Sequence, residues 1–186
     1  MNRLTLKGLP LSGLRLVERS SVTDGRGALT RLFCAQELAQ AGWRQPVAQI
    51  NHTWTARGGT VRGMHYQRPP HAEMKLVTCL RGAVWDVAVD LRAGSATFLQ
   101  WHAEELSAIN HRAMLIPEGF AHGFQTLADD CELIYLHSMA YVPGAEAGLN
   151  SRDPRLSIGW PLALTELSTK DAQYPYLDDE FSGVTL

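Results

Sequence analysis

The central part of the chain consists of short runs in which apolar and polar residues alternate, separated by residues that favour tight turns. This pattern predicts six strands, which cover residues 75–79, 84–91, 97–101, 113–116, 123–127 and 133–138. The connections carry the glycine, proline or aspartate that turns require, as in Pro117-Glu118-Gly119. Many short, evenly spaced strands are typical of a sandwich or barrel, so we expect an all-β, jelly-roll β-barrel.

The two ends of the chain have different patterns. Leucines alternate with other residues over residues 4–16, which predicts a strand and does not resemble a signal peptide. Helical periodicity is confined to residues 35–41. From Val142 onward proline, glycine and aspartate become more frequent, which predicts a tail that wraps the barrel and contains one or two short helices.

The length, charge and cysteines of the chain limit what it can be. A chain of 186 residues fits one domain, so we expect a single domain over residues 1–186. With 17 Lys+Arg against 19 Asp+Glu there is no surplus of basic residues for a nucleic-acid-binding face, and no stretch is long and apolar enough to span a membrane. Three widely spaced cysteines without a CxxC pair indicate neither disulfides nor a zinc site, which favours the cytoplasm.

Two segments carry a pattern of a known barrel family. Pro117, Gly119 and His122 form a PxGxxH pattern that resembles the second motif of cupins, which are small jelly-roll barrels. The first cupin motif resembles the segment that begins Gly63-Met64-His65-Tyr66-Gln67 and ends at Gly82. In metal-binding cupins the two motifs supply three histidines and a carboxylate, but here Gln67 replaces one histidine and Met74-Lys75 replaces the acid.

This replacement changes the expected chemistry of the cavity. An ammonium group such as that of Lys75 would repel a divalent cation by several kcal/mol, so we expect no metal. A cavity that contains His65, His122 and Lys75 is suited to proton transfer and to the stabilisation of negative charge on a substrate oxygen.

Each of these residues also has an ordinary structural interpretation. His122 could support another polar group, and alternation alone does not decide which face of the strand Lys75 occupies. The other histidines lack such a context, and we expect them to be ordinary: His71, His102, His111 and His137.

Over nearly its whole length, the chain resembles the dTDP-4-dehydrorhamnose 3,5-epimerase family. The resemblance lies in several separate motifs that occur in the same order and at the same spacing, namely residues 24–27, 62–67, 75–92, 115–124 and 168–171. It implies an isomerase without cofactors, which inverts C3, C5 or both of a nucleotide-linked 4-keto-6-deoxyhexose in deoxysugar biosynthesis.

The family also implies roles for four residues. By similarity, His65 removes the proton from the carbon beside the ketone, and Lys75 stabilises the enolate oxygen. Asp171 orients the His65 ring and favours its charged form. Tyr135 returns a proton from the opposite face. Without the resemblance, Tyr135 would be interpreted as a core aromatic residue and Asp171 as a solvated carboxylate of the tail.

The resemblance extends to substrate binding and assembly. Seven residues match positions that bind the nucleotide sugar, and they are Arg26, Gln49, Asn51, Arg62, His122, Glu146 and Lys170. We expect His52 to be a neighbour of the pocket. Family members are homodimers that exchange N-terminal strands, so a partner chain is expected to supply some nucleotide contacts.

Two departures from the family pattern leave the substrate open. The family usually has aromatic residues and an acid where this chain has Ala28-Leu29-Thr30-Arg31, and a pair of tyrosines where it has Ala140-Tyr141. The nucleotide base is therefore not determined. Three alternatives also stay open: a single-site epimerase of another nucleotide sugar, a metal-dependent cupin, and a sugar-binding cupin without catalysis.

Overall fold

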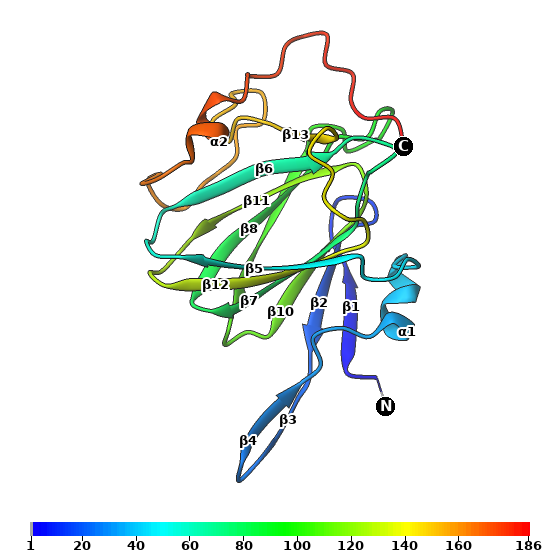
Figure 1. Cartoon of the computed structure of the whole chain (residues 1–186), viewed down its shortest axis with the longest axis vertical. Helices are drawn as coiled ribbons and strands as arrows, with labels where there is room; N and C mark the ends of the chain where they lie inside the picture. The colour runs from blue at the N-terminus through cyan, green and yellow to red at the C-terminus, as the bar shows by residue number, and fades with distance from the viewer. Residues whose placement is uncertain (1) are drawn as a thin grey trace.

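The computed structural model describes residues 2–186, and two antiparallel sheets form its body (Figure 1). The first sheet has the strand order β1-β2-β10-β7-β12-β5. Its strands are β1 (Leu4–Gly8), β2 (Arg15–Arg19), β10 (Arg112–Ile116), β7 (Lys75–Arg81), β12 (Cys131–His137) and β5 (Gln49–Thr55).

The second sheet has the order β13-β6-β11-β8-β9 and faces the first. Its strands are β13 (Glu146–Gly148), β6 (Val61–Gln67), β11 (Phe120–Thr126), β8 (Ala83–Asp90) and β9 (Trp101–Ser107). No hydrogen-bonded strand pair of residues 2–186 joins the two sheets, so the barrel is a flattened one with open edges. The all-β, cupin-type jelly-roll fold that the strand pattern predicted is confirmed.

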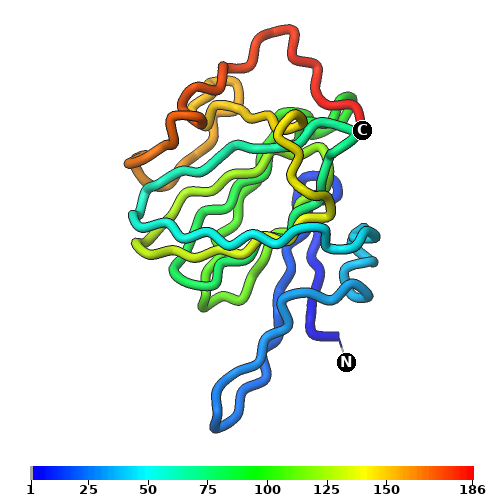
Figure 2. Tube along the Cα trace, viewed as in Figure 1, coloured from blue at the N-terminus to red at the C-terminus, as the bar shows by residue number. Residues whose placement is uncertain are grey.

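Three elements lie outside the sheets. β3 (Ser21–Asp24) and β4 (Gly27–Thr30) form a hairpin that extends away from the body, as the trace in Figure 2 makes clear. The helical segment α1 (Ala35–Leu38) continues as a 3-10 turn over Ala39–Ala41, and α2 (Thr169–Gln173) is the one helix of the tail within residues 2–186. No helix of this part of the chain is long and apolar enough to cross a membrane.

Apolar side chains form three layers of packing. The interior cluster joins both sheets, for example through Val77 and Met114 of the first and Ala88 and Phe124 of the second. A second cluster packs the tail, including Leu149, on the outer face of the second sheet. The third, around Trp43, packs the α1 segment on the outer face of the first sheet. Burial of these layers is the main source of stability and leaves one end of the interior for polar groups.

Two of the strand predictions were wrong. Residues 97–99 form a turn instead of a strand, because the Ser95 and Thr97 hydroxyls both donate to the buried carboxylate of Asp90 at 2.6 Å. The strand begins only at Trp101. Residues 4–16 form the hairpin of β1 and β2, not one strand, since the chain turns back between Gly8 and Arg15.

Two glycines allow neighbouring strands to approach closely. Gly82 has φ +75° and lies where the chain crosses from the first sheet to the second, and an added Cβ would lie 2.6 Å from Cys131 Sγ. Gly63 has φ +120°, and its added Cβ would lie 2.6 Å from Gly123 Cα. These strands can therefore approach only with glycine at both positions.

Candidate active site

A cavity of about 690 Å³ opens between the two sheets at one end of the barrel. Strands of both sheets line it: β6 and β11 on one side, and β5, β7 and β12 on the other. Residues 166–171 of the tail close part of its rim. Both sheets thus point polar side chains into one space of the size of a small-molecule site.

His65 and Asp171 form a hydrogen-bonded pair on the β6 side of the cavity. The Asp171 carboxylate lies 2.6 Å from His65 Nε2, and its other oxygen accepts from the Gly63 N–H at 3.2 Å. Burial opposes ionisation of Asp171, but the hydrogen bond and the charge of His65 outweigh it and hold the Asp171 pKa below its ordinary value. An ionised Asp171 accepts from Nε2–H, which leaves the Nδ1 lone pair of His65 free as a base.

A helix cap explains how the tail delivers Asp171. Ser168 is the N-cap of α2, and its hydroxyl accepts a hydrogen bond from the Asp171 N–H at 3.0 Å. This contact fixes the first turn of the helix. The carboxylate of a residue 106 positions away from His65 is thereby directed at β6.

Tyr135 approaches the cavity from the other sheet. It lies on β12, is 9% exposed, and its hydroxyl lies 3.2 Å from Thr53 Oγ1 of β5. Burial raises the pKa of Tyr135, so the phenol keeps its proton at neutral pH. His65 and Tyr135 both line the cavity and come from different sheets, so an imidazole and a phenol lie on opposite walls.

His122 forms a second histidine–carboxylate pair. It is the register partner of His65 on β11, and its Nε2 lies 2.8 Å from Asp86 Oδ1. Burial raises the pKa of Asp86, whose Oδ2 has no hydrogen-bond partner among the described residues. His122 also lines the cavity, so it combines the structural contact with access to a ligand.

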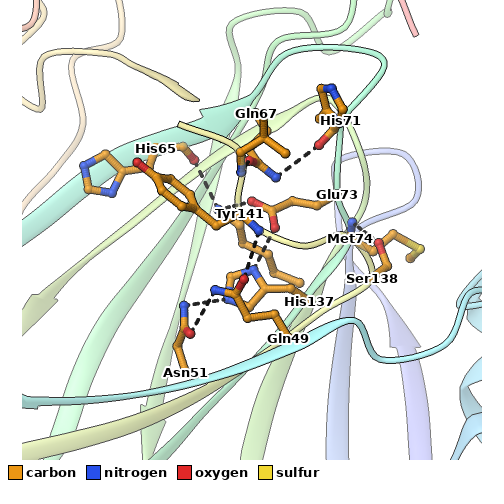
Figure 3. Close-up of polar contacts among 12 residues, drawn as sticks. Gln49, Asn51, His65, Gln67, His71, Glu73, Met74, His137, Ser138 and Tyr141 are labelled. Carbon is orange, nitrogen blue, oxygen red and sulfur yellow. Dashed lines mark hydrogen bonds and ion pairs between the residues drawn. The ribbon is translucent and has the colours of Figure 1, made fainter. Parts of the chain in front are cut away.

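Lys75 points into the cavity and belongs to a cluster with Glu73 and His137. The Lys75 ammonium lies 3.2 Å from Glu73 Oε1 and 3.5 Å from the His65 carbonyl oxygen. The other oxygen of Glu73 lies 2.7 Å from His137 Nδ1. Figure 3 shows the His137 ring between Glu73 and the amide of Asn51. The question of which face Lys75 occupies is thereby decided: it faces the interior.

Gln67 occupies the position of a metal-binding histidine but has a structural environment. Its amide donates to the carbonyl oxygen of His71 (Figure 3). It also donates to the carbonyl oxygen of Ala140 and accepts from the Val142 N–H at 2.7 Å. Gln67 therefore supports the loop that follows β12. Within residues 2–186, no group of three or more His, Cys, Asp or Glu side chains is placed to hold a metal ion.

Polar residues surround the mouth of the cavity. Asn51, Arg62 and Lys170 line it, and Arg62 Nε donates to Thr55 Oγ1 at 3.0 Å. Two further residues with an expected binding role lie behind the residues that line the cavity. Glu146 pairs with Lys170 at 2.5 Å, and Gln49 donates to Asn51 Oδ1 at 3.0 Å. Both hold residues that line the cavity and do not line it themselves.

Arg26 and His52 lie outside the cavity of their own chain. Arg26 is at the tip of the β3–β4 hairpin and pairs with Asp24 at 2.6 Å. His52 is an exposed residue of β5 and pairs with Glu132, because alternation turns it away from the face that carries Asn51. Arg31, which departs from the acid usual in the family, forms an ion pair with Glu37 of the α1 segment.

Sequence reasoning missed two residues of this site. His137 was expected to be ordinary, and this was wrong, since it lines the cavity. The signal was present in the sequence: His137 follows Tyr135 by two positions, so both point to one face of β12. Glu73 precedes β7 and carries no strand periodicity, so only the fold reveals its contacts with Lys75 and His137.

Comparison with known proteins gives a consistent result. Residues 8–179 match the family model described as dTDP-4-dehydrorhamnose 3,5-epimerase. The protein of that name from Streptomyces griseus is 40% identical over 172 residues, which cover 91% of this chain and 85% of the relative. A dTDP-4-dehydrorhamnose 3-epimerase from Streptomyces niveus is 37% identical over 169 residues, with 90% and 81% covered.

A solved structure also resembles this chain over nearly its whole length. The crystal structure of dTDP-6-deoxy-D-glucose-3,5-epimerase from Legionella pneumophila, in complex with dTDP-4-keto-L-rhamnose, superposes with a TM-score of 0.90. It is 35% identical, and the match covers 97% of this chain and 98% of that one.

Proposed function

The chain belongs to the dTDP-4-dehydrorhamnose 3,5-epimerase family, and from its cavity we propose how it acts as an isomerase of a dTDP-linked 4-keto-6-deoxyhexose. Its reaction inverts C3, C5 or both by proton transfer through an enolate. The observation that carries the proposal is the placement of a histidine–aspartate pair and a buried tyrosine on opposite walls of one cavity. Inversion at a planar carbon requires a base and an acid on different sides.

The proposed step begins at His65. Its Nδ1 takes the proton from the carbon beside the ketone, the C–H electron pair forms a carbon–carbon double bond, and the carbonyl electrons move to oxygen. Asp171, ionised and 2.6 Å from Nε2, stabilises the imidazolium that results. Lys75 stabilises the enolate oxygen.

Tyr135 completes the step. Its hydroxyl, which keeps its proton because burial raises its pKa, protonates the carbon from the opposite face. The carbonyl forms again, and the stereocentre is inverted. His65 then releases its proton to solvent and the phenolate takes one up, so the enzyme returns to its starting state.

The mouth of the cavity suits the remainder of the substrate. Arg62 and Lys170 are cations at the rim, and a diphosphate there would place the attached sugar beside His65. His122 and Asn51 offer further hydrogen bonds to the sugar. Gln49 and Glu146 would act indirectly, by holding Asn51 and Lys170.

The test is to incubate the protein with dTDP-4-keto-6-deoxyglucose in heavy water and to follow C3 and C5 by NMR. We expect deuterium at one or both carbons and an inverted product. Exchange at both indicates a 3,5-epimerase, whereas exchange at C3 alone indicates a 3-epimerase like the Streptomyces niveus relative. Binding of the nucleotide sugar without exchange would refute the proposal.

We also propose that the chain forms one cytoplasmic domain, residues 1–186, and works as a homodimer. Two features support the dimer: the β3–β4 hairpin projects from the body with Val22 and Leu29 exposed, and the edge strand β5 exposes Ile50 and Trp54. Such unpaired apolar surface is typical of an interface. In a dimer with strand exchange, a hairpin could bring Arg26 to the nucleotide of the partner's cavity.

The molecular mass of the protein in solution tests the proposed dimer. For a chain of 20.6 kDa, sedimentation equilibrium should give about twice that mass at micromolar concentration. Exchange of Leu29 for aspartate should shift the protein toward the monomer, because it places charge on the exposed apolar surface of the hairpin. A monomer at all concentrations would contradict the dimer.

A further inference from the structure

The structure contains a buried ion cluster beside the proposed catalytic pair, and neither the reaction nor the family resemblance assigned a role to two of its members. From this geometry, and resting on the epimerase function, we infer that Glu73 is a positioning residue. It holds Lys75 in place as the donor to the ketone oxygen of the substrate, and through His137 it also holds the amide of Asn51 at the cavity, so that His137 is a second positioning residue.

The strand register brings Lys75 and His137 together. Lys75 of β7 and His137 of β12 are direct partners in adjacent antiparallel strands. Side chains of such partners start about 5 Å apart, so one carboxylate can contact both. Glu73 lies between them, and each of its carboxylate oxygens meets one partner, at 3.2 Å for the ammonium and 2.7 Å for the imidazole.

Glu73 differs from Lys75 and His137 in its access to the cavity. The side chains of Glu73, Lys75 and His137 are 8%, 9% and 11% exposed, but only Lys75 and His137 line the cavity. Burial raises the pKa of Glu73, yet the hydrogen bond from His137 and the charge of Lys75 outweigh it, so the pKa lies below its ordinary value. Glu73 is therefore an anion behind the wall and acts only through the groups that it holds.

The contacts of Lys75 and His137 reach two walls of the cavity. Lys75 Nζ is 3.5 Å from the carbonyl oxygen of His65, so the ammonium lies next to the strand that carries the base. His137 Nδ1–H donates to Glu73, which leaves Nε2 as the acceptor for the Asn51 amide nitrogen 3.4 Å away, and Gln49 donates to the Asn51 oxygen. Glu73 thus holds Lys75 directly and Asn51 through His137, and both line the cavity.

Other ionisable groups contribute to the potential at the ketone oxygen. They face Lys75 and His137 from the neighbouring strands and are His65 of β6, Asp86 of β8, His122 of β11 and Tyr135 of β12. None of them contacts Glu73 among the described hydrogen bonds, so substitution of Glu73 affects Lys75 and His137 specifically.

The test is Glu73→Gln, which keeps the shape but removes the charge. We expect kcat and deuterium exchange to fall about 10- to 100-fold, as for a misplaced catalytic group, while KM and the affinity for dTDP change less than about threefold. In a Lys75→Met background the same substitution should cause a smaller further loss, because Glu73 then acts through His137 alone. His137→Gln should lower kcat about 10-fold and serves as the second variant if Glu73→Gln does not fold.

The matched control is Glu104→Gln. Glu104 pairs with His102 at 2.9 Å on β9, outside the cavity, so kcat should stay at the wild-type value. If wild type exchanges normally but folded Glu73→Gln and His137→Gln keep full kcat, the inference is wrong. An equal further loss in the Lys75→Met background would also overturn it. Absence of exchange in the wild type would instead refute the epimerase function itself.

Discussion

Replacing His65 with alanine will lower kcat and the rate of deuterium exchange at the reacting carbon by about a thousandfold or more. The substitution removes the one side chain of residues 2–186 that is hydrogen-bonded to the Asp171 carboxylate and lines the cavity from β6. Asp171 itself cannot replace it, because its two oxygens are directed at His65 Nε2 and the Gly63 N–H. NMR spectra of reaction samples quenched at intervals over several hours will measure the residual rate of deuterium exchange.

His102→Ala is the matched control for this prediction. His102 also pairs with a carboxylate, that of Glu104, but lies on β9 outside the cavity. Both variants should have similar melting temperatures, and only His65→Ala should lose activity. Wild-type exchange by folded His65→Ala would show that another group removes the proton.

Replacing Tyr135 with phenylalanine should separate exchange from inversion. Without the hydroxyl, His65 can still remove a proton and return a deuteron to the same face, so the substrate gains label while its configuration is retained. We expect formation of the inverted product to fall about a hundredfold or more. The change is close to isosteric and deletes only the contact with Thr53, so the fold should tolerate it.

A proton NMR spectrum distinguishes the two outcomes, because the coupling constants of the ring report configuration and the loss of a signal reports label. Tyr176→Phe is the control, since Tyr176 is 56% exposed and does not line the cavity. Inverted product at the wild-type rate from Tyr135→Phe would assign the acid to another residue. Loss of both exchange and inversion would mean that Tyr135 also takes part in proton removal.

The sequence predicted the fold well because its signals are local. Alternation and turn residues located five of the six expected strands of the central region, with boundaries within a few residues. The sixth was wrong because side chains of Ser95 and Thr97 bond to Asp90, a buried contact that has no periodicity. The cupin motifs, and not alternation, placed His65 and His122 at the cavity, where the structure has them on β6 and β11.

What the sequence by itself determined is therefore the all-β fold, the two motifs and the absence of an acid at position 75. Only the tertiary structure decided the partnerships: Asp171 beside His65, Asp86 beside His122, and Glu73 between Lys75 and His137. Alternation assigns a side chain to a face of its own strand. The contacts it makes depend on cross-strand register and on how the two sheets and the tail pack, and these are set by the folded chain as a whole.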